Sequence, residues 1–315
     1  MLTRKAINSG NYGIETIVKE YCGLKKSKHI IGIWQHGVYL PEVIYSPDQL
    51  ASHEIPLLIR KRYPFFVATK HDKDFLLANG YRNVHAIGLP IVYTKVEPKA
   101  KVRDSILLLP DHSVEWHSQK QPFAEYALFV EKIIKNFSRV TLSLHKHDYT
   151  PRNIELFKNY NNLKIVLGAS EWDLSSLKRS ASLFSSHEYA CANTINSGLI
   201  YAGFFGCKIS IAGPKSNYQQ ILNSALPTFK DNSELLNKLN FGYEQINEKY
   251  NFLRLPNTSL KDSKSYVNLC SDLVGFRFKK TPNELMRILG LTHTNLIRKY
   301  ALHSITRIAQ CTEKN

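Results

Sequence analysis

The sequence lacks the short motifs that identify several common classes of enzyme. No GxGxxG follows the first apolar run and no GxxxxGK[ST] occurs, which argues against nicotinamide dehydrogenases and P-loop enzymes. There is no HExxH and no quartet of cysteines and histidines, so a zinc site is not expected. The absence of GxSxG weakens the hypothesis of a hydrolase.

Long apolar runs and regularly spaced cysteines are also missing. No run approaches the roughly 20 apolar residues of a membrane span, and Met1–Lys5 is followed by polar residues, unlike a secretory signal. We therefore expect a cytoplasmic globular protein. Its cysteines have no metal-ligand spacing and indicate reduced thiols: they are Cys22, Cys191, Cys207, Cys270 and Cys311.

The charge is strongly unbalanced, with 42 lysines and arginines against 26 acidic residues and a net charge of +16. Such an excess favours a polyanionic partner, which can be nucleic acid, an anionic membrane surface or a phosphorylated substrate. Because the basic residues are spread along the chain, they do not indicate a disordered nucleic-acid-binding tail.

Apolar runs alternate with helical patterns, which is typical of an α/β fold. We expect two Rossmann-like domains that face each other across a cleft, followed by a helical C-terminal tail. The expected parts are an N-terminal domain at 1–98, a C-terminal domain at 104–270 and a basic tail at 271–315. Expected strands are 30–34, 64–69, 84–87, 105–109, 140–144, 163–167, 181–184 and 208–211, and expected helices are 14–21, 70–78, 122–137, 154–159 and 172–180.

The segment 181–211 is the most informative part of the sequence. We interpret 181–184 as a strand and 185–188 as a polar loop after it, with Asn193 and Thr194 as N-caps of a short helix. A helix N-terminus presents unpaired N–H groups and favours a phosphate. An ordinary β-α-β turn with a capped helix would show the same local pattern.

Polar clusters with a histidine follow four of the expected strands. The carboxyl ends of parallel strands meet at one edge of a sheet, so three clusters should converge there and the first should face them. Each histidine has the alternative of a surface or hydrogen-bonded structural role. The clusters are Gln35–Gly37, Asp111–Ser113, His145–Asp148 and Ser185–Glu188.

Three segments carry a resemblance to a known family: Trp34–Gly37 with 68–90, then 107–113, then 185–214. The second part of the first segment reads GYRNV followed by IGLP. On these residues the chain resembles bacterial GT-B glycosyltransferases that build capsule or lipopolysaccharide O-antigen chains, over about residues 30–215. The resemblance implies an acceptor domain, and a donor domain whose strand-loop-helix motif receives the nucleotide's phosphates.

Two positions differ from better-known members of this family. Retaining members often carry two glutamates eight positions apart, but Glu188 is followed eight positions later by Asn196. Members that use CMP-linked acidic sugars often carry His-Pro after a donor-domain strand, whereas His145 precedes Lys146 here.

The resemblance implies a nucleotide-sugar donor, a polysaccharide or lipid-linked glycan acceptor, and neither cofactor nor metal. We hypothesise that His36 or Asp111 is the general base, since histidine's ordinary pKa of about 6.5 suits proton transfer. His112 would bridge donor and acceptor, and Glu188 could accept from a ribose. The candidate donor-binding residues are His145, Lys146, Ser185, Ser186, His187, Glu188, Asn193, Thr194 and Ser197.

Residues 292–308 place apolar side chains on one helical face and basic residues beside it. This pattern fits a helix on an anionic inner-membrane surface, and equally a helix docked on the protein core. Two alternative functions remain at this point. One is a sugar-nucleotide epimerase of similar fold, and the other is a basic nucleic-acid-binding protein, which the absence of a recognised binding motif disfavours.

Overall fold

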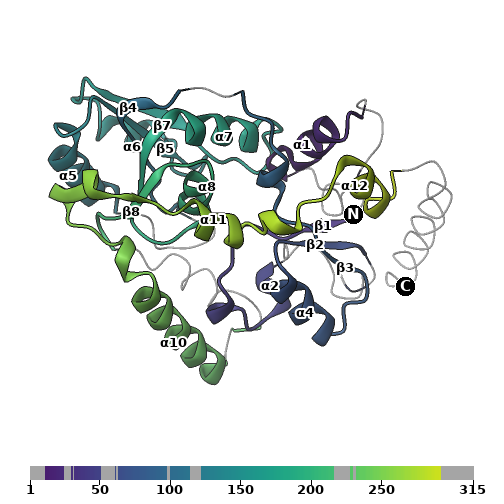
Figure 1. Ribbon diagram of the computed structural model, residues 1–315. Helices are drawn as coiled ribbons and strands as arrows, with labels where there is room; N and C mark the ends of the chain where they lie inside the picture. The colour runs from purple at the N-terminus through teal and green to yellow at the C-terminus, as the bar shows by residue number, and fades with distance from the viewer. Residues whose placement is uncertain are drawn as a thin grey trace, which may run out of the picture.

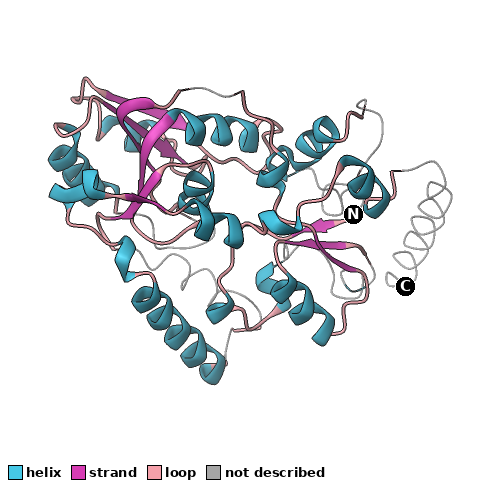
Figure 2. Ribbon diagram, in the orientation of Figure 1, coloured by secondary structure: helices cyan, strands magenta, loops and turns pink. Residues whose placement is uncertain are grey.

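The computed structural model describes residues 11–24, 30, 32–50, 61, 63–97, 100–113, 122–215, 228–229 and 232–291, in which the apolar runs form two sheets (Figure 2). The larger sheet has the strand order β6-β5-β4-β7-β8-β9 in this described part. All neighbours are parallel except β9, which is antiparallel to β8. The strands are β4 (Val102–Leu108), β5 (Arg139–Leu144), β6 (Leu163–Leu167), β7 (His187–Ala192), β8 (Lys208–Ile211) and β9 (Lys264–Ser265).

Both faces of the larger sheet are covered, which explains why its strands are runs of apolar residues rather than alternating patterns. Ile106 and Leu108 of β4 belong to the cluster beneath α5 (Phe123–Ile134). Leu107, between them, belongs to the cluster on the opposite face, with residues of α7 (Ser176–Ser186) and α8 (Ser197–Phe204). This alternation is the two-residue period of a strand.

The smaller sheet consists of β1 (Ile33–Trp34), β2 (Phe65–Val67) and β3 (Val84–Ala86), which are parallel in that order among the described residues. After β2, Thr69 begins α4 (Lys70–Ala78) with a capping box to Asp72. The remaining elements are η1 (Asn11–Gly13), α1 (Ile14–Tyr21), η2 (Pro41–Val43), α2 (Pro47–Leu50), η3 (Pro90–Tyr93), α6 (Pro151–Glu155), α10 (Ser233–Lys249), η4 (Asn251–Leu253), η5 (Asn257–Asp262), α11 (Val267–Leu273), η6 (Phe276–Phe278) and α12 (Pro282–Ile288).

One hydrophobic cluster extends across both halves of the fold, beside two further clusters that each belong to one half. Trp34 and Phe66 of the smaller sheet belong to the same buried cluster as Leu107 and Leu199 of the larger half. The segment from α11 to α12 runs from the larger sheet to the smaller one, where α12 lies near α1 (Figure 1). The hydroxyl of Tyr21 in α1 donates to the carbonyl of Lys280 at 2.9 Å.

Most of the expected elements are confirmed, with ends that differ by a few residues, and the order of strands and helices is that of a mixed α/β fold. The prediction of a strand at 181–184 is wrong, because α7 continues through Ser186 and β7 begins at His187. The expected tail helix at 292–308 lies outside the described residues. In the described part of the chain, no helix is both long enough and apolar enough to span a membrane.

Candidate functional site

The strand order of the larger sheet creates a switch point beside β4. The chain leaves β4 toward β5 and β6 on one side, and returns to β7 and β8 on the other. At such a point the loops after the two central strands separate, and ligands of open α/β sheets bind there. In this protein the two loops are residues 109–113 after β4 and 193–196 after β7.

Asp111 joins these two loops. Its backbone N–H donates to Asn193 Oδ1 at 2.9 Å, while its carboxylate accepts from Thr194 Oγ1 at 2.7 Å and from Asn196 Nδ2 at 2.9 Å. Asp111 is 3% exposed. Both carboxylate oxygens therefore already accept a hydrogen bond inside the junction, and Asp111 holds the two loops together.

The helix after β7 begins later than the sequence pattern indicated. Its N-cap is Asn196, whose Oδ1 accepts from the backbone N–H of Leu199 at 2.9 Å. The prediction that Asn193 or Thr194 caps this helix is therefore wrong, since both belong to the loop held by Asp111. Asn193 has a second distinctive feature. Its Nδ2 is buried and has no hydrogen-bond partner within the described residues, in a side chain that is 1% exposed.

The predicted cluster after β1 meets the larger half at the start of α8. The backbone N–H of Val38 donates to Ser197 Oγ at 2.9 Å. Gly37 has a φ of 80°, and a Cβ there would lie 2.5 Å from Ser197 Oγ. Gln35 is buried and connects this loop to the end of β2, since its Oε1 accepts a hydrogen bond from the N–H of Ala68. His36 is exposed beside them.

Three histidines from the ends of β4 and β5 lie together. The ring centroids of His112 and His145 are 4.1 Å apart in a stacked arrangement, and those of His145 and His147 are 4.8 Å apart. Burial is the main cause that lowers the pKa of His112 and lowers the pKa of His145 to about 2. His145 is therefore a neutral imidazole at physiological pH. The prediction that His112 and His145 converge at one edge is confirmed.

The loop after β6 and the N-terminal segment border this histidine cluster. Lys146 Nζ lies 3.3 Å from Glu171 Oε1. The backbone N–H of Tyr12 donates to the carbonyl of Glu171 at 2.7 Å, and the Tyr12 ring lies 5.6 Å from the ring of His36. Tyr12 has a φ of 56°, a left-handed conformation that costs a residue with a Cβ about 1–2 kcal/mol. Sequence reasoning missed Tyr12, because nothing in its neighbours marks it.

The remaining predicted donor-binding residues lie at the opposite edge of the sheet, which corrects their placement. Ser185 and Ser186 end α7, and their hydroxyls donate to backbone carbonyls of the same helix, those of Ser182 and Leu183. His187 begins β7 and is 1% exposed, with Nε2 2.9 Å from Thr141 Oγ1 and Nδ1 2.8 Å from the carbonyl of Leu183. Its pKa is lowered, chiefly by burial. A polar loop was expected here because these side chains are hydrophilic, but their hydrogen bonds are met within the fold.

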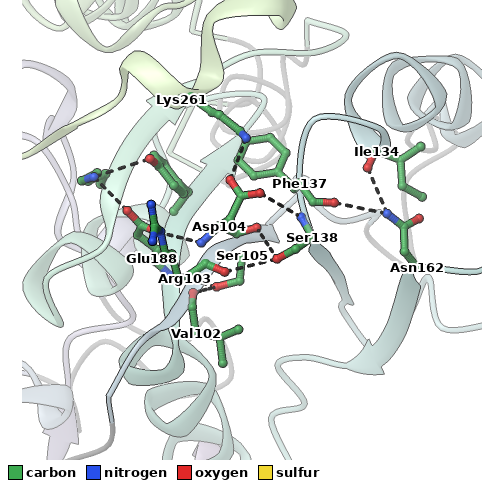
Figure 3. A network of polar contacts seen from close by, with 12 residues as sticks. Val102, Arg103, Asp104, Ser105, Ile134, Phe137, Ser138, Asn162, Glu188 and Lys261 are labelled. Atoms are coloured by element: carbon green, nitrogen blue, oxygen red, sulfur yellow. Dashed lines mark hydrogen bonds and ion pairs between the residues drawn. The ribbon is translucent and has the colours of Figure 1, made fainter.

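Glu188 is part of a structural network at this amino edge (Figure 3). Its Oε2 accepts from the N–H of Asp104 at 2.7 Å, and its Oε1 lies 2.9 Å from Lys208 Nζ. The hydrogen bond from Asp104 is the main cause that lowers the pKa of Glu188. Asp104 in turn pairs with Lys261 at 2.7 Å and accepts from the N–H of Ser138. The strand β7 separates Glu188 from the switch point, so the proposed contact with a ribose is not supported.

The histidine cluster does not have the arrangement of a metal site. Among the described residues, no three side chains of histidine, cysteine, aspartate or glutamate are placed to hold a metal ion. The cluster is thus a set of stacked rings rather than a set of converging ligands.

Comparisons with known proteins find distant similarity to solved structures. No family model and no curated protein matches the chain. S. aureus MnaA in a co-structure with UDP is 14% identical, with a TM-score of 0.38 over 74% of this chain and 69% of MnaA. The pneumococcal O-GlcNAc transferase GtfA in complex with UDP and GlcNAc is 12% identical, with a TM-score of 0.34 over 70% of this chain and 45% of GtfA. A mutant of S. aureus TarM in complex with UDP is 12% identical, with a TM-score of 0.28 over 66% of this chain and 43% of TarM. The matched region spans less than half the length of both GtfA and TarM.

Proposed function

We propose that this protein is a glycosyltransferase that moves a sugar from a nucleotide-sugar donor to a glycan acceptor. The observation that carries the proposal is the meeting of four loops at the switch point. The loop of Asp111 after β4, the loop of Asn193 after β7, the loop of His145 after β5 and the loop of His36 after β1 of the smaller sheet each follow the carboxyl end of a parallel strand. That is the edge at which α/β folds bind nucleotides.

The donor would bind to the larger half. Asn193 Nδ2 is a buried donor without a partner in the described chain, and leaving such a group unpaired costs about 1–3 kcal/mol. A phosphate or ribose oxygen would satisfy it. The backbone nitrogen of His147 lies 3.4 Å from His145 Nδ1, an arrangement that favours the neutral tautomer with its proton on Nε2, from which it would donate to the ligand. Lys146 adds a positive charge beside it.

In the transfer step, His36 would accept the proton of the acceptor hydroxyl as its oxygen bonds to the anomeric carbon. The bond from that carbon to the phosphate oxygen breaks, and the nucleotide leaves with the electron pair. Hydrogen bonds from Asn193 and His145 and the charge of Lys146 would stabilise the negative charge that develops on the leaving phosphate. His36 is exposed and can therefore reach the hydroxyl of an acceptor, whereas Asp111 is buried.

The finer parts of the proposal concern organisation and acceptor. We propose a GT-B arrangement, with an acceptor domain at 1–98 and a nucleotide-sugar domain at 104–270. The acceptor would be a cell-surface polysaccharide or a lipid-linked oligosaccharide, as in capsule or O-antigen synthesis. The enzyme would act in the cytoplasm at the inner membrane, with the basic tail as its contact with anionic lipid, and without a metal.

Ligand-dependent stability tests the proposal. We expect one nucleotide among CMP, CDP, UDP and GDP, or its sugar, to stabilise the protein by about 2.7 kcal/mol at 100 times its Kd. Lys146→Met should weaken that binding, while Lys70→Met, an exposed lysine on α4, is the matched control. Incubation with the sugar of that nucleotide then separates two reactions. Release of the nucleotide indicates transfer or hydrolysis of the sugar, whereas an isomeric nucleotide-sugar indicates an epimerase.

A further inference from the structure

The histidine cluster has a geometry that a simple hydrogen-bonding role does not require. His112, His145 and His147 are all half-buried, and every pair of rings is within 6.5 Å between centroids. The two nearest rings are stacked at 4.1 Å with 19° between their planes. Three imidazoles from two adjacent strand ends therefore form one continuous surface at the carboxyl edge of the sheet.

Protonation of more than one of these three histidines is unfavourable when no anion is bound. Two protonated rings at such distances repel each other, so the cluster holds more than one proton only if an anion lies against it. The charged groups around it include the carboxylates of Asp111 and Asp148, which raise the pKa of His112 but do not outweigh its burial. His112 faces Asp111, Asp148 and His147, while His145 faces His112, His147, Lys146 and His36.

The nearby carboxylates are already engaged elsewhere. Asp111 accepts from Thr194 and Asn196, and Asp148 Oδ2 accepts from the N–H of Ser113 at 2.8 Å. Glu171 pairs with Lys146. His112 thus faces two carboxylates that are held in place by the loops, whereas His145 faces Lys146 and other histidines.

We infer that His112, His145 and His147 form a proton-coupled anion site, which binds a phosphate-like dianion and takes up protons from solvent as it does so. The identification of that phosphate as part of a nucleotide rests on the proposed function, but the anion site does not. Anion affinity should rise as the pH falls, because the bound state holds more protons than the free state. Donor binding would then tighten as the pH falls below the ordinary histidine pKa of about 6.5.

Histidine ring signals in NMR test this directly, with inorganic sulfate as the probe because its charge is constant across the useful pH range. Each ring is followed through a pH titration with and without saturating sulfate, at equal ionic strength made up with chloride. We expect the pKa of at least one of the three rings to rise by about one unit or more with sulfate, equivalent to a tenfold change. His71, exposed on α4 and facing Asp72 and Asp74, is the internal control and should not move.

The variants His112→Gln, His145→Gln and His147→Gln assign the signals, and each should weaken sulfate binding in the pH range where the rings titrate. If no ring of the cluster shifts more than His71, the inference is overturned. Calorimetry of the best nucleotide-sugar in buffers of different ionisation enthalpy distinguishes the two proposals. Nucleotide binding without proton uptake removes the proton-coupled site and leaves the transferase proposal. Sulfate-induced shifts without any nucleotide binding remove the transferase proposal and leave the anion site.

Discussion

Ser197 Oγ accepts a hydrogen bond from the backbone N–H of Val38 at 2.9 Å, and this contact ties the loop after β1 to the first turn of α8. The two residues are far apart in the sequence and belong to different halves of the fold. Their contact fixes where the loop of His36 lies relative to Asn193 and Asp111. This contact therefore helps to fix the position of the candidate base, together with the hydrogen bond from the N–H of His36 to the carbonyl of Leu50 at 3.2 Å.

Gly37→Ala should destabilise the protein for two separable reasons. Alanine at a φ of 80° is strained by about 1–2 kcal/mol, and its Cβ would lie 2.5 Å from Ser197 Oγ. Gly23→Ala is the matched control, since Gly23 has a φ of 67° and nothing within 4 Å of the added Cβ. Urea unfolding should show a larger loss for Gly37→Ala than for Gly23→Ala. Ser197→Ala in the Gly37→Ala background should recover only part of the difference, because it removes the close contact but also the hydrogen bond from Val38. Equal losses for the two glycines would contradict the close contact.

Asp111→Asn should destabilise the loop junction. The new amide can accept from Asn196 Nδ2 and donate to Thr194 Oγ1, so both partners are kept, but two charge-assisted hydrogen bonds become neutral ones, which costs about 1 kcal/mol. Thr194→Val removes one of these hydrogen bonds and should also destabilise the junction. Asp272→Asn, at an exposed position, is the control. A variant Asp111→Asn with unchanged unfolding free energy would show that Asp111 does not hold the two loops.

His36→Ala should reduce turnover without loss of stability. His36 is exposed, so its truncation leaves no cavity, but removal of a general base lowers the rate by about 100- to 10,000-fold. The comparison is His71→Ala, which is also an exposed histidine. Both variants are assayed for nucleotide release with the donor identified by stabilisation, and for unfolding in urea. Near-normal turnover of His36→Ala would remove its catalytic role.

The α/β class and most strand positions could be predicted from the sequence, because buried parallel strands are continuous apolar runs such as Leu163–Leu167. The position of His112 and His145 at one edge of the sheet could also be predicted, since both follow parallel strands and the direction of the strands determines that edge. The error at 181–188 has a physical cause. Ala181, Leu183 and Phe184 suit a helix as well as a strand, and the buried ring of His187 at the start of β7 is satisfied by Thr141 and by the carbonyl of Leu183. Thr141 is distant from His187 in the sequence, so this hydrogen bond could not be predicted from the local pattern.

Glu188→Gln should lower stability but leave nucleotide binding unchanged. The variant weakens the pair with Lys208 and the hydrogen bond from Asp104, and for this partly exposed group the cost is about 1 kcal/mol. Nucleotide affinity should not change, because Glu188 lies at the amino edge of β7. Lys146→Met gives the reverse pattern in the same two measurements. A fall in nucleotide affinity for Glu188→Gln would show that Glu188 contributes to donor binding after all.

Stability should decline as the pH falls below about 6.5, the ordinary pKa of histidine, because several buried histidines bind protons more weakly in the folded state. Burial lowers the pKa of His187 and of His145, so in this range the unfolded chain holds more protons than the folded one. Protonation therefore favours unfolding, and the free energy of unfolding rises with pH through this window. His187→Gln should make that rise less steep, whatever its effect on absolute stability.

His71 should have the opposite effect on the pH dependence of stability. Its hydrogen bond with Asp72 raises its pKa, so it stabilises the folded state at low pH and loses that contribution as the pH rises through its folded value. His71→Gln should therefore make the pH slope of stability more positive between about pH 6.5 and the folded pKa of His71, while His187→Gln makes the slope less positive below about pH 6.5. Urea unfolding at a series of pH values measures both slopes. If the two variants change the slope in the same direction, the burial of His187 as a neutral imidazole is wrong.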